Sequence, residues 1–126
     1  MYSHAEGLGT VAVNSYTHAE GNGSEASGIS SHAEGIETYA KGDGSHSEGS
    51  STFAIGKHSH AEGYGSVAQI TAVSGHAEGS NTFALGAASH SEGSNTYATG
   101  DHSHSGGINS NAIGWASFAH GNGVIA

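Results

Sequence analysis

The sequence predicts an all-β fold, a parallel β-roll solenoid with about 14 residues and two short strands in each rung. Three observations indicate this fold. A Ser-His-small-Glu-Gly motif recurs at a fixed interval, a Thr-aromatic-Ala-x-Gly motif fills the gaps, and small and large side chains alternate within each half. Alternation is the period of a β-strand, and a short fixed repeat is typical of solenoids.

The motif returns at one constant spacing, except that the step from Ser59 to Gly75 is two residues longer. Both halves of a unit share the skeleton hydroxyl-x-small-x-Gly-x-x. A coiled coil is excluded, because its seam needs large apolar residues at two heptad positions, which are Gly and Ala or Ser here. We predict a single repeat domain over residues 1–126, with about nine rungs that start at Ser3, Thr17, Ser31, Ser45, Ser59, Gly75, Ser89, Ser103 and Ser117.

Small side chains are expected inside each rung. The fifth position of every unit is Gly, and the tenth is Ala from Ala12 to Ala112. Alternation predicts that Ser/Thr, Ala/Ser and Gly point inward, and that each Gly opens a turn with the next two residues, where Gly can take a positive φ. With strands about 4.8 Å apart, nine rungs make a rod roughly 40 Å long.

So thin a core predicts that another chain covers one outer face. Burying one methyl group contributes about 0.8 kcal/mol, whereas ordering one backbone residue costs about 1–2 kcal/mol. The second half of each unit, except that of Glu25 and Ser27, points at least one large apolar side chain outward, as at a subunit interface. We call this surface the apolar sheet face, and its predicted interface residues are Val11, Val13, Tyr39, Phe53, Ile55, Val67, Phe83, Leu85, Tyr97 and Ile113.

The first half of each unit points histidine and glutamate outward. We expect a polar, solvated surface on which each histidine donates to the carboxylate two positions away on its own strand. Imidazole titrates near pH 6.5, so this surface should respond to mild acid. We call it the His/Glu ladder, and its residues are His4, Glu6, His18, Glu20, His32, Glu34, His46, Glu48, His60, Glu62, His76, Glu78, His90, Glu92 and His104.

Metal binding is an alternative for the histidines, because imidazole and carboxylate suit zinc or nickel. Two pairs of histidines lie two residues apart, which makes His58, His60, His102 and His104 candidate ligands. A flat ladder, however, presents parallel rather than convergent ligands, so we favour a solvated or hydrogen-bonded surface and predict no cofactor. Neighbouring Ser and His point to opposite faces of a strand, so they form no nucleophile–base couple, and we predict no enzyme.

Composition excludes several classes of partner and structure. Eleven acidic against two basic residues give a net charge of −9, which disfavours nucleic acid and anionic membrane surfaces. The absence of cysteine excludes disulfides and thiolate metal sites. No apolar run reaches membrane-spanning length and no signal peptide opens the chain, so we expect no direct membrane contact in this segment, and any export signal to lie outside it.

The second half-repeats resemble a known family. "STFAIG" (Ser51–Gly56), "NTFALG" (Asn81–Gly86) and "NSNAIG" (Asn109–Gly114) are similar to the S-V-A-I-G repeats of YadA-like heads in trimeric autotransporter adhesins, and similar repeats occur in phage tail-fibre proteins. The resemblance implies a left-handed roll, a homotrimer and adhesion to a host surface protein or glycan. It also implies an extracellular location, on a bacterial cell surface through an outer-membrane anchor elsewhere, or on a virion.

Three functions remain open from the sequence. The first is an adhesion module, the second is a structural spacer of a phage fibre or appendage, and the third is a metal- or pH-responsive His/Glu surface.

Two segments depart from the repeat pattern, and both departures have structural explanations. The unit containing "VAQITAVSG" (Val67–Gly75) has two extra residues, which predict a longer surface turn or, as the alternative, a protruding loop that contacts a partner. Phe118 and His120 replace His and Glu in a last rung that caps the stack or continues it.

Overall fold

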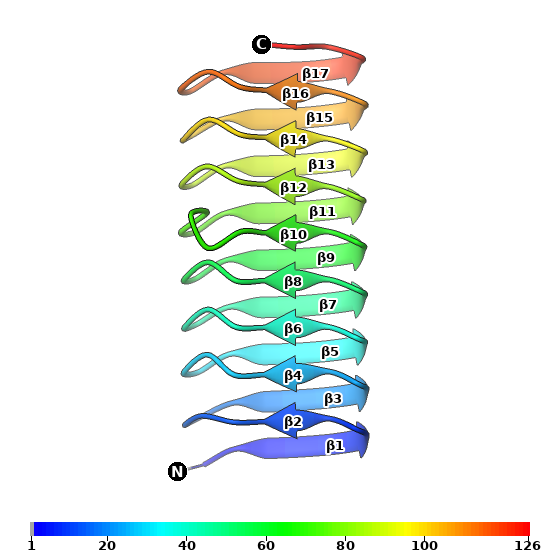
Figure 1. The fold of residues 1–126 in the computed structure, drawn as a ribbon, viewed down its shortest axis with the longest axis vertical. Coiled ribbons are helices and arrows are strands. Elements are labelled where there is room, and N and C mark those ends of the chain that lie inside the picture. The colour runs from blue at the N-terminus through cyan, green and yellow to red at the C-terminus, as the bar shows by residue number, and fades with distance from the viewer. Residues whose placement is uncertain (1) are drawn as a thin grey trace.

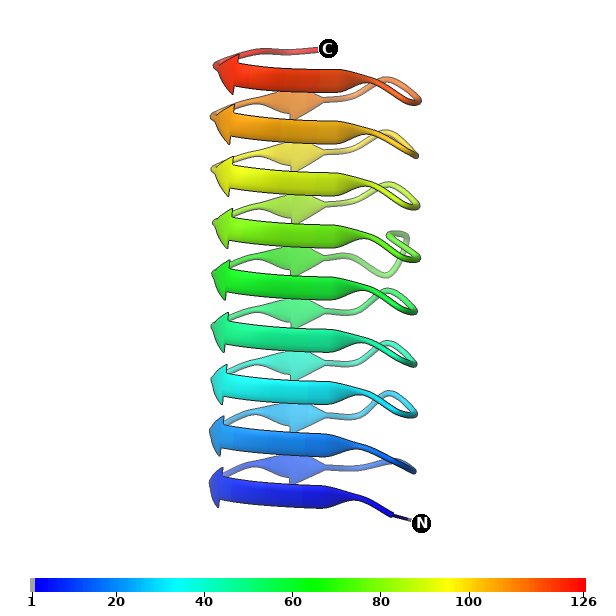
Figure 2. The same cartoon turned by 180° about the vertical axis from the view of Figure 1, so that it is seen from behind.

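Two parallel β-sheets stand back to back and form a straight rod (Figures 1 and 2). The computed structural model of the chain describes residues 2–126. The chain alternates between the sheets, so one sheet holds nine strands in the order β1-β3-β5-β7-β9-β11-β13-β15-β17, and the other holds eight, β2 to β16. The predicted all-β, parallel solenoid and its rung length are confirmed, and the two ends of the chain lie at opposite ends of the rod (Figure 1).

The two sheets differ in strand length. The strands of the nine-stranded sheet have five residues each: β1 (His4–Leu8), β3 (His18–Asn22), β5 (His32–Ile36), β7 (His46–Ser50), β9 (His60–Tyr64), β11 (His76–Ser80), β13 (His90–Ser94), β15 (His104–Ile108) and β17 (Phe118–Asn122). Those of the other sheet have two: β2 (Val11–Ala12), β4 (Glu25–Ala26), β6 (Tyr39–Ala40), β8 (Phe53–Ala54), β10 (Val67–Ala68), β12 (Phe83–Ala84), β14 (Tyr97–Ala98) and β16 (Asn111–Ala112).

Equivalent residues of successive rungs lie directly above one another. His32 of β5 pairs with His46 of β7, and Ala40 of β6 pairs with Ala54 of β8. The step from β9 to β11 keeps this register despite its two extra residues, since His60 pairs with His76. Each outward side chain is therefore repeated along the rod at strand spacing.

The interior between the sheets contains only small side chains. Its apolar members are alanines, such as Ala40 and Ala54, and the largest fully buried side chains are threonines. Buried hydroxyls bond to one another, as from Thr38 Oγ1 to Ser24 Oγ at 2.9 Å and from Thr82 Oγ1 to Ser66 Oγ at 2.9 Å. The prediction of inward Ser/Thr and Ala is thus confirmed.

The glycines of the first half-repeats lie within the strands. The prediction that they point inward and open a turn is therefore wrong. Gly35 lies inside β5 with a φ of 117°, and its equivalents Gly21, Gly49 and Gly63 are exposed. A Cβ atom on Gly35 would overlap the carbonyl oxygen of Gly49 in the next rung. Because a positive φ breaks the alternation of strand side chains, this position is open to solvent although it holds the smallest residue.

Most second-half glycines are buried, and none of them takes the positive φ that the sequence predicts. A Cβ atom on Gly42 would overlap the carbonyl oxygen of Gly56, so glycine is needed here for close stacking of rungs. The left-handed conformation falls on the second residue after glycine, as at Gly44 (φ 64°) and His58 (φ 55°). These corner residues bond to the preceding rung, since the His58 N–H donates to the Asp43 carbonyl at 2.8 Å.

The two extra residues form an enlarged corner loop between β10 and β11, as the sequence predicts (Figure 1). Ala72 is buried within this loop, and its N–H donates to the Gln69 carbonyl at 2.9 Å. Ile70 is 70% exposed on the outside of the loop. Across residues 2–126, the structure has no helix with the length and hydropathy of a membrane span.

Candidate functional site

The imidazole rings of the His/Glu ladder form a continuous stack on the outer face of the nine-stranded sheet. Their centroids lie 4.6 to 4.9 Å apart from His18 to His104, and most successive rings are within 8° of parallel. The spacing is that of the rungs, because each histidine is the first residue of its strand. At mid-rod about a third of each side chain is exposed, as for His60 (34%) and Glu62 (32%).

Histidine pairs with the glutamate of the preceding rung rather than with that of its own strand, which corrects the expectation from the sequence. At mid-rod, the distance between the histidine and the glutamate of the same strand is long, for example 4.0 Å between His76 Nε2 and Glu78 Oε2. Only near the N-terminal end does the same-strand pair dominate, as in His4–Glu6 at 3.2 Å. The inter-rung Nε2–Oε1 distances are 3.5 Å for His46–Glu34, 3.2 Å for His60–Glu48, 3.5 Å for His76–Glu62, 3.1 Å for His90–Glu78 and 3.0 Å for His104–Glu92.

An open groove runs beside the glutamate column because the next residue in every strand is glycine. Over the first rungs it is lined by Glu6, Glu20, Glu34 and Glu48 with the glycines that follow them, and farther along by Glu62, Glu78 and Glu92 with theirs. Without side chains at the glycines, the carboxylates stay accessible from one side. The sequence contains this signal, since glycine follows every ladder glutamate, but simple alternation placed the glycine inside.

The pKa values of the ladder show how strongly its groups influence one another. Burial, and then the charge of neighbouring imidazoles, lowers the pKa of His32, His46 and His76. A shared hydrogen bond with the Glu78 carboxyl, reinforced by burial and by Glu48, raises the pKa of Glu62 to about 7. The same Glu62–Glu78 hydrogen bond lowers the pKa of Glu78. Glu62 therefore holds its proton at a pH where an isolated carboxyl would be ionised.

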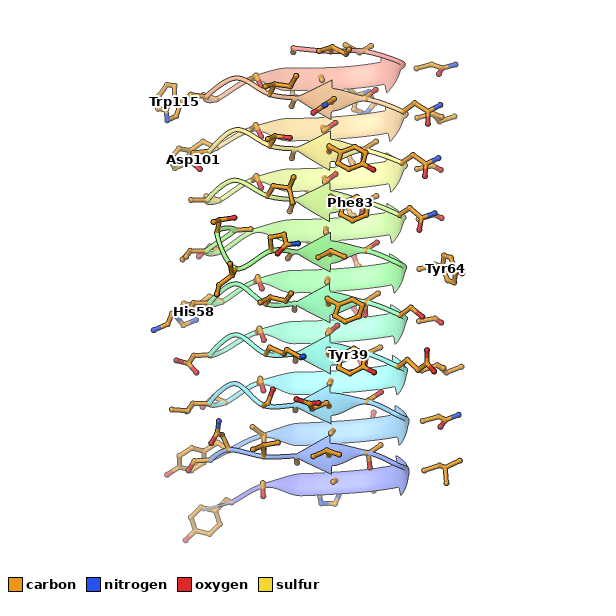
Figure 3. All side chains as sticks on the ribbon, in the orientation of Figure 1. Tyr39, His58, Tyr64, Phe83, Asp101 and Trp115 are labelled. Atoms are coloured by element: carbon orange, nitrogen blue, oxygen red, sulfur yellow. The ribbon has the colours of Figure 1, made fainter. Side chains whose placement is uncertain are left out.

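The histidine pairs predicted as metal ligands are separated by the fold. His58 lies in an exposed corner with a positive φ, whereas His60 starts β9 in the ladder (Figure 3 labels His58). His102 lies at the equivalent corner and packs edge-on against Trp115, with centroids 6.0 Å apart, whereas His104 starts β15. Within residues 2–126, groups of three potential ligands form instead between successive rungs of the ladder.

The residues of the apolar sheet face lie together on the outer side of the eight-stranded sheet. Figure 3 shows Tyr39 and Phe83 over this sheet. Tyr39 stacks on Phe53 and Phe83 stacks on Tyr97, each with centroids 4.8 Å apart. Val11, Val13, Tyr97 and Ile113 are 40 to 53% exposed in the single chain, and Phe53, Ile55, Val67, Phe83 and Leu85 are partly exposed.

A second row of exposed apolar residues was not identified from the sequence. It follows the first-half glycines at the corner where the nine-stranded sheet ends, and includes Leu8, Ile36, Tyr64 and Ile108, each at least 51% exposed. Tyr64 is seen at this corner in Figure 3, opposite the corner of His58 and Trp115. Asn22, Ser50, Ser80 and Ser94 occupy the same row in other rungs, so no regular apolar pattern marks it in the sequence.

Comparison of the sequence with protein-family models and with curated proteins found no match.

Proposed function

We propose that this chain is a non-enzymatic adhesion module, a rigid homotrimeric rod that presents one surface many times to a host surface protein or glycan. The observation that carries the proposal is the in-register stacking of outward side chains, which repeats the His/Glu ladder at every rung. A weak contact repeated along a rod and on three chains gains avidity without any strong single site. The place of action is extracellular, on a bacterial cell surface or a virion.

The homotrimer is supported by the distribution of apolar side chains. No fully buried side chain in residues 2–126 is larger than threonine, whereas Phe53, Phe83 and Tyr97 keep their rings on the outer surface. Apolar surface of this kind is stabilised when other copies cover it. Three copies and a left-handed coil agree with the resemblance to YadA-like head repeats, and the path of the rising chain in Figure 1 supports the left-handed sense.

Binding to immobilised protein tests the adhesion proposal. The rod is attached to a surface and presented with host cells, extracellular matrix proteins and a glycan array. We expect binding that falls when the ladder charge is removed in a Glu34→Gln/Glu48→Gln/Glu62→Gln variant of unchanged oligomeric state. Binding that is indifferent to these substitutions would place the adhesive surface elsewhere.

A structural spacer of a phage tail fibre or appendage is the second candidate. The uniform rungs and straight rod support it, because such a rod can hold a distal receptor-binding domain at a fixed distance (Figure 1). Absence of binding across the whole panel, by a rod of intact trimeric state, would favour the spacer over the adhesion module.

A further inference from the structure

The His/Glu ladder brings potential metal ligands together in a way that its sequence does not suggest. Four groups of three residues place one imidazole nitrogen or carboxylate oxygen each within 4.8 Å of one another: His32–Glu34–His46, His46–Glu48–His60, Glu62–His76–Glu78 and Glu78–His90–Glu92. In each group, side chains of one rung extend toward those of the next rung, so the potential ligand atoms converge. The parallel arrangement expected from a flat ladder is therefore not what these groups show.

The group around His76 has the geometry closest to a metal site. His76 Nε2 lies 3.5 Å from Glu62 Oε1 and 4.0 Å from Glu78 Oε2. Ligand atoms about 2.0–2.2 Å from a tetrahedral zinc ion are roughly 3.3–3.6 Å apart. A small rotation of the flexible Glu78 side chain would bring its Oε2 atom to this distance from His76 Nε2.

The His76 nitrogen is also left without a hydrogen-bond partner within the protein. Its Nε2 atom is buried and makes no hydrogen bond, although the ring is held between its stacked neighbours His60 and His90. A buried polar atom without a partner costs free energy. The groups with two histidines fit less well, because stacked parallel rings such as His32 and His46, 4.8 Å apart, must tilt before both nitrogens reach one ion.

We propose that Glu62, His76 and Glu78 bind a divalent transition-metal ion such as Zn²⁺, through His76 Nε2 and one oxygen of each carboxylate. Solvent in the adjoining groove, which is lined by Glu62, Gly63, Glu78 and Gly79, supplies the fourth ligand. The ion neutralises two carboxylates that the stacking holds together. The site adds metal binding to the proposed adhesion function and does not depend on it.

Shared residues allow the site to be tested alone. His46 belongs to two of the other groups and His90 to the third, so a His46→Phe/His90→Phe background, which keeps an aromatic ring beside His76, leaves Glu62–His76–Glu78 as the one complete group within residues 2–126. Untagged protein freed of metal with EDTA is dialysed and titrated with Zn²⁺ by calorimetry. We expect this background to bind one Zn²⁺ per chain, and His76→Ala added to it to weaken binding at least about tenfold.

His18→Ala added to the same background is the matched control, because His18 lies in the ladder but in none of the four groups. It should leave zinc affinity unchanged. Glu78→Gln gives a second, nearly isosteric loss-of-ligand variant in case His76→Ala perturbs the stack, and circular dichroism checks folding. Zinc binding that survives both His76→Ala and Glu78→Gln, or a background that binds no zinc, overturns the proposal.

Discussion

At the scale of single residues, the Glu62 carboxyl makes stability depend on pH. Glu62 is flanked by Glu48 and Glu78, and its pKa is raised to about 7, first by the hydrogen bond shared with Glu78. A pKa raised above its unfolded value means that the folded state binds the proton more tightly. The resulting stabilisation is complete below about pH 4.5, the unfolded pKa, and is lost as the pH rises through about 7.

Glu62→Gln should therefore change the pH dependence of stability. Glutamine cannot ionise, so the variant escapes the loss of stability that the wild type undergoes as the pH rises from about 4.5 to about 7. In buffers with EDTA, the thermal midpoint of the variant minus that of the wild type should rise between pH 5 and pH 8.5. A difference that stays flat or falls over this range would contradict the shared-proton account. Glu25→Gln, on the opposite sheet, is the control.

Glycine within the longer strands is required by contact between rungs. Gly35→Ala should lower the thermal midpoint by about 5 °C or more, because the added methyl group meets the Gly49 carbonyl and alanine disfavours a φ of 117°. Gly23→Asn is the matched control, since a Cβ there meets only Glu37 Cγ at 3.6 Å and Asn81 already takes the equivalent conformation. Differential scanning calorimetry compares the two, and equal midpoints would refute the role assigned to Gly35.

At the scale of the elements, the two sheets differ in the side chains on their outer faces. The eight-stranded sheet turns aromatic rings outward, and the nine-stranded sheet turns its stacked imidazoles and carboxylates outward. Both sheets share an interior of alanine, serine and threonine. The proposed assembly would therefore use the eight-stranded sheet, and the His/Glu ladder on the other sheet would stay in contact with solvent.

Double substitutions on each sheet test which outer face is needed for assembly. Phe53→Glu with Phe83→Glu should abolish assembly and folding together, because the carboxylates would be buried between chains without partners. His32→Ala with Glu34→Ala removes two partly exposed side chains and one weak ion pair, His46–Glu34 at 3.5 Å, and should lower the thermal midpoint by only a few degrees. Circular dichroism and size-exclusion chromatography report both effects. The reverse ranking of the two double variants would mean that the assembly surface is the ladder side.

The sequence predicts much of the element pattern but not its details. Strand type, the rung length and the outward direction of His32 and Phe53 follow from alternation and period, and the structure has all of them. The position of Gly35 could not be predicted, because alternation holds only while φ stays negative. The pairing of His76 with Glu62 was also missed, since it depends on side-chain rotamers across rungs rather than on spacing within a strand.

At the scale of the whole molecule, the fold is held along its axis by backbone hydrogen bonds between rungs and has little apolar material inside. Strand pairing in the nine-stranded sheet continues from β1 to β17 along the whole rod (Figure 2). The large apolar side chains remain outside, on the apolar sheet face and at the corner of Leu8 and Tyr64. From the sequence, the number of copies and the handedness rest on the resemblance to YadA-like repeats, because periodicity alone encodes neither.

The mass of the folded protein in solution tests the account most directly. The protomer has a mass of 12.4 kDa. Light scattering at micromolar concentration should give about three times this value if, as we propose, three copies cover one another's aromatic rings. A monodisperse species at the protomer mass, with the circular dichroism of β-structure and solvent-exposed phenylalanines, would contradict the proposal that the rod exists only as an assembly.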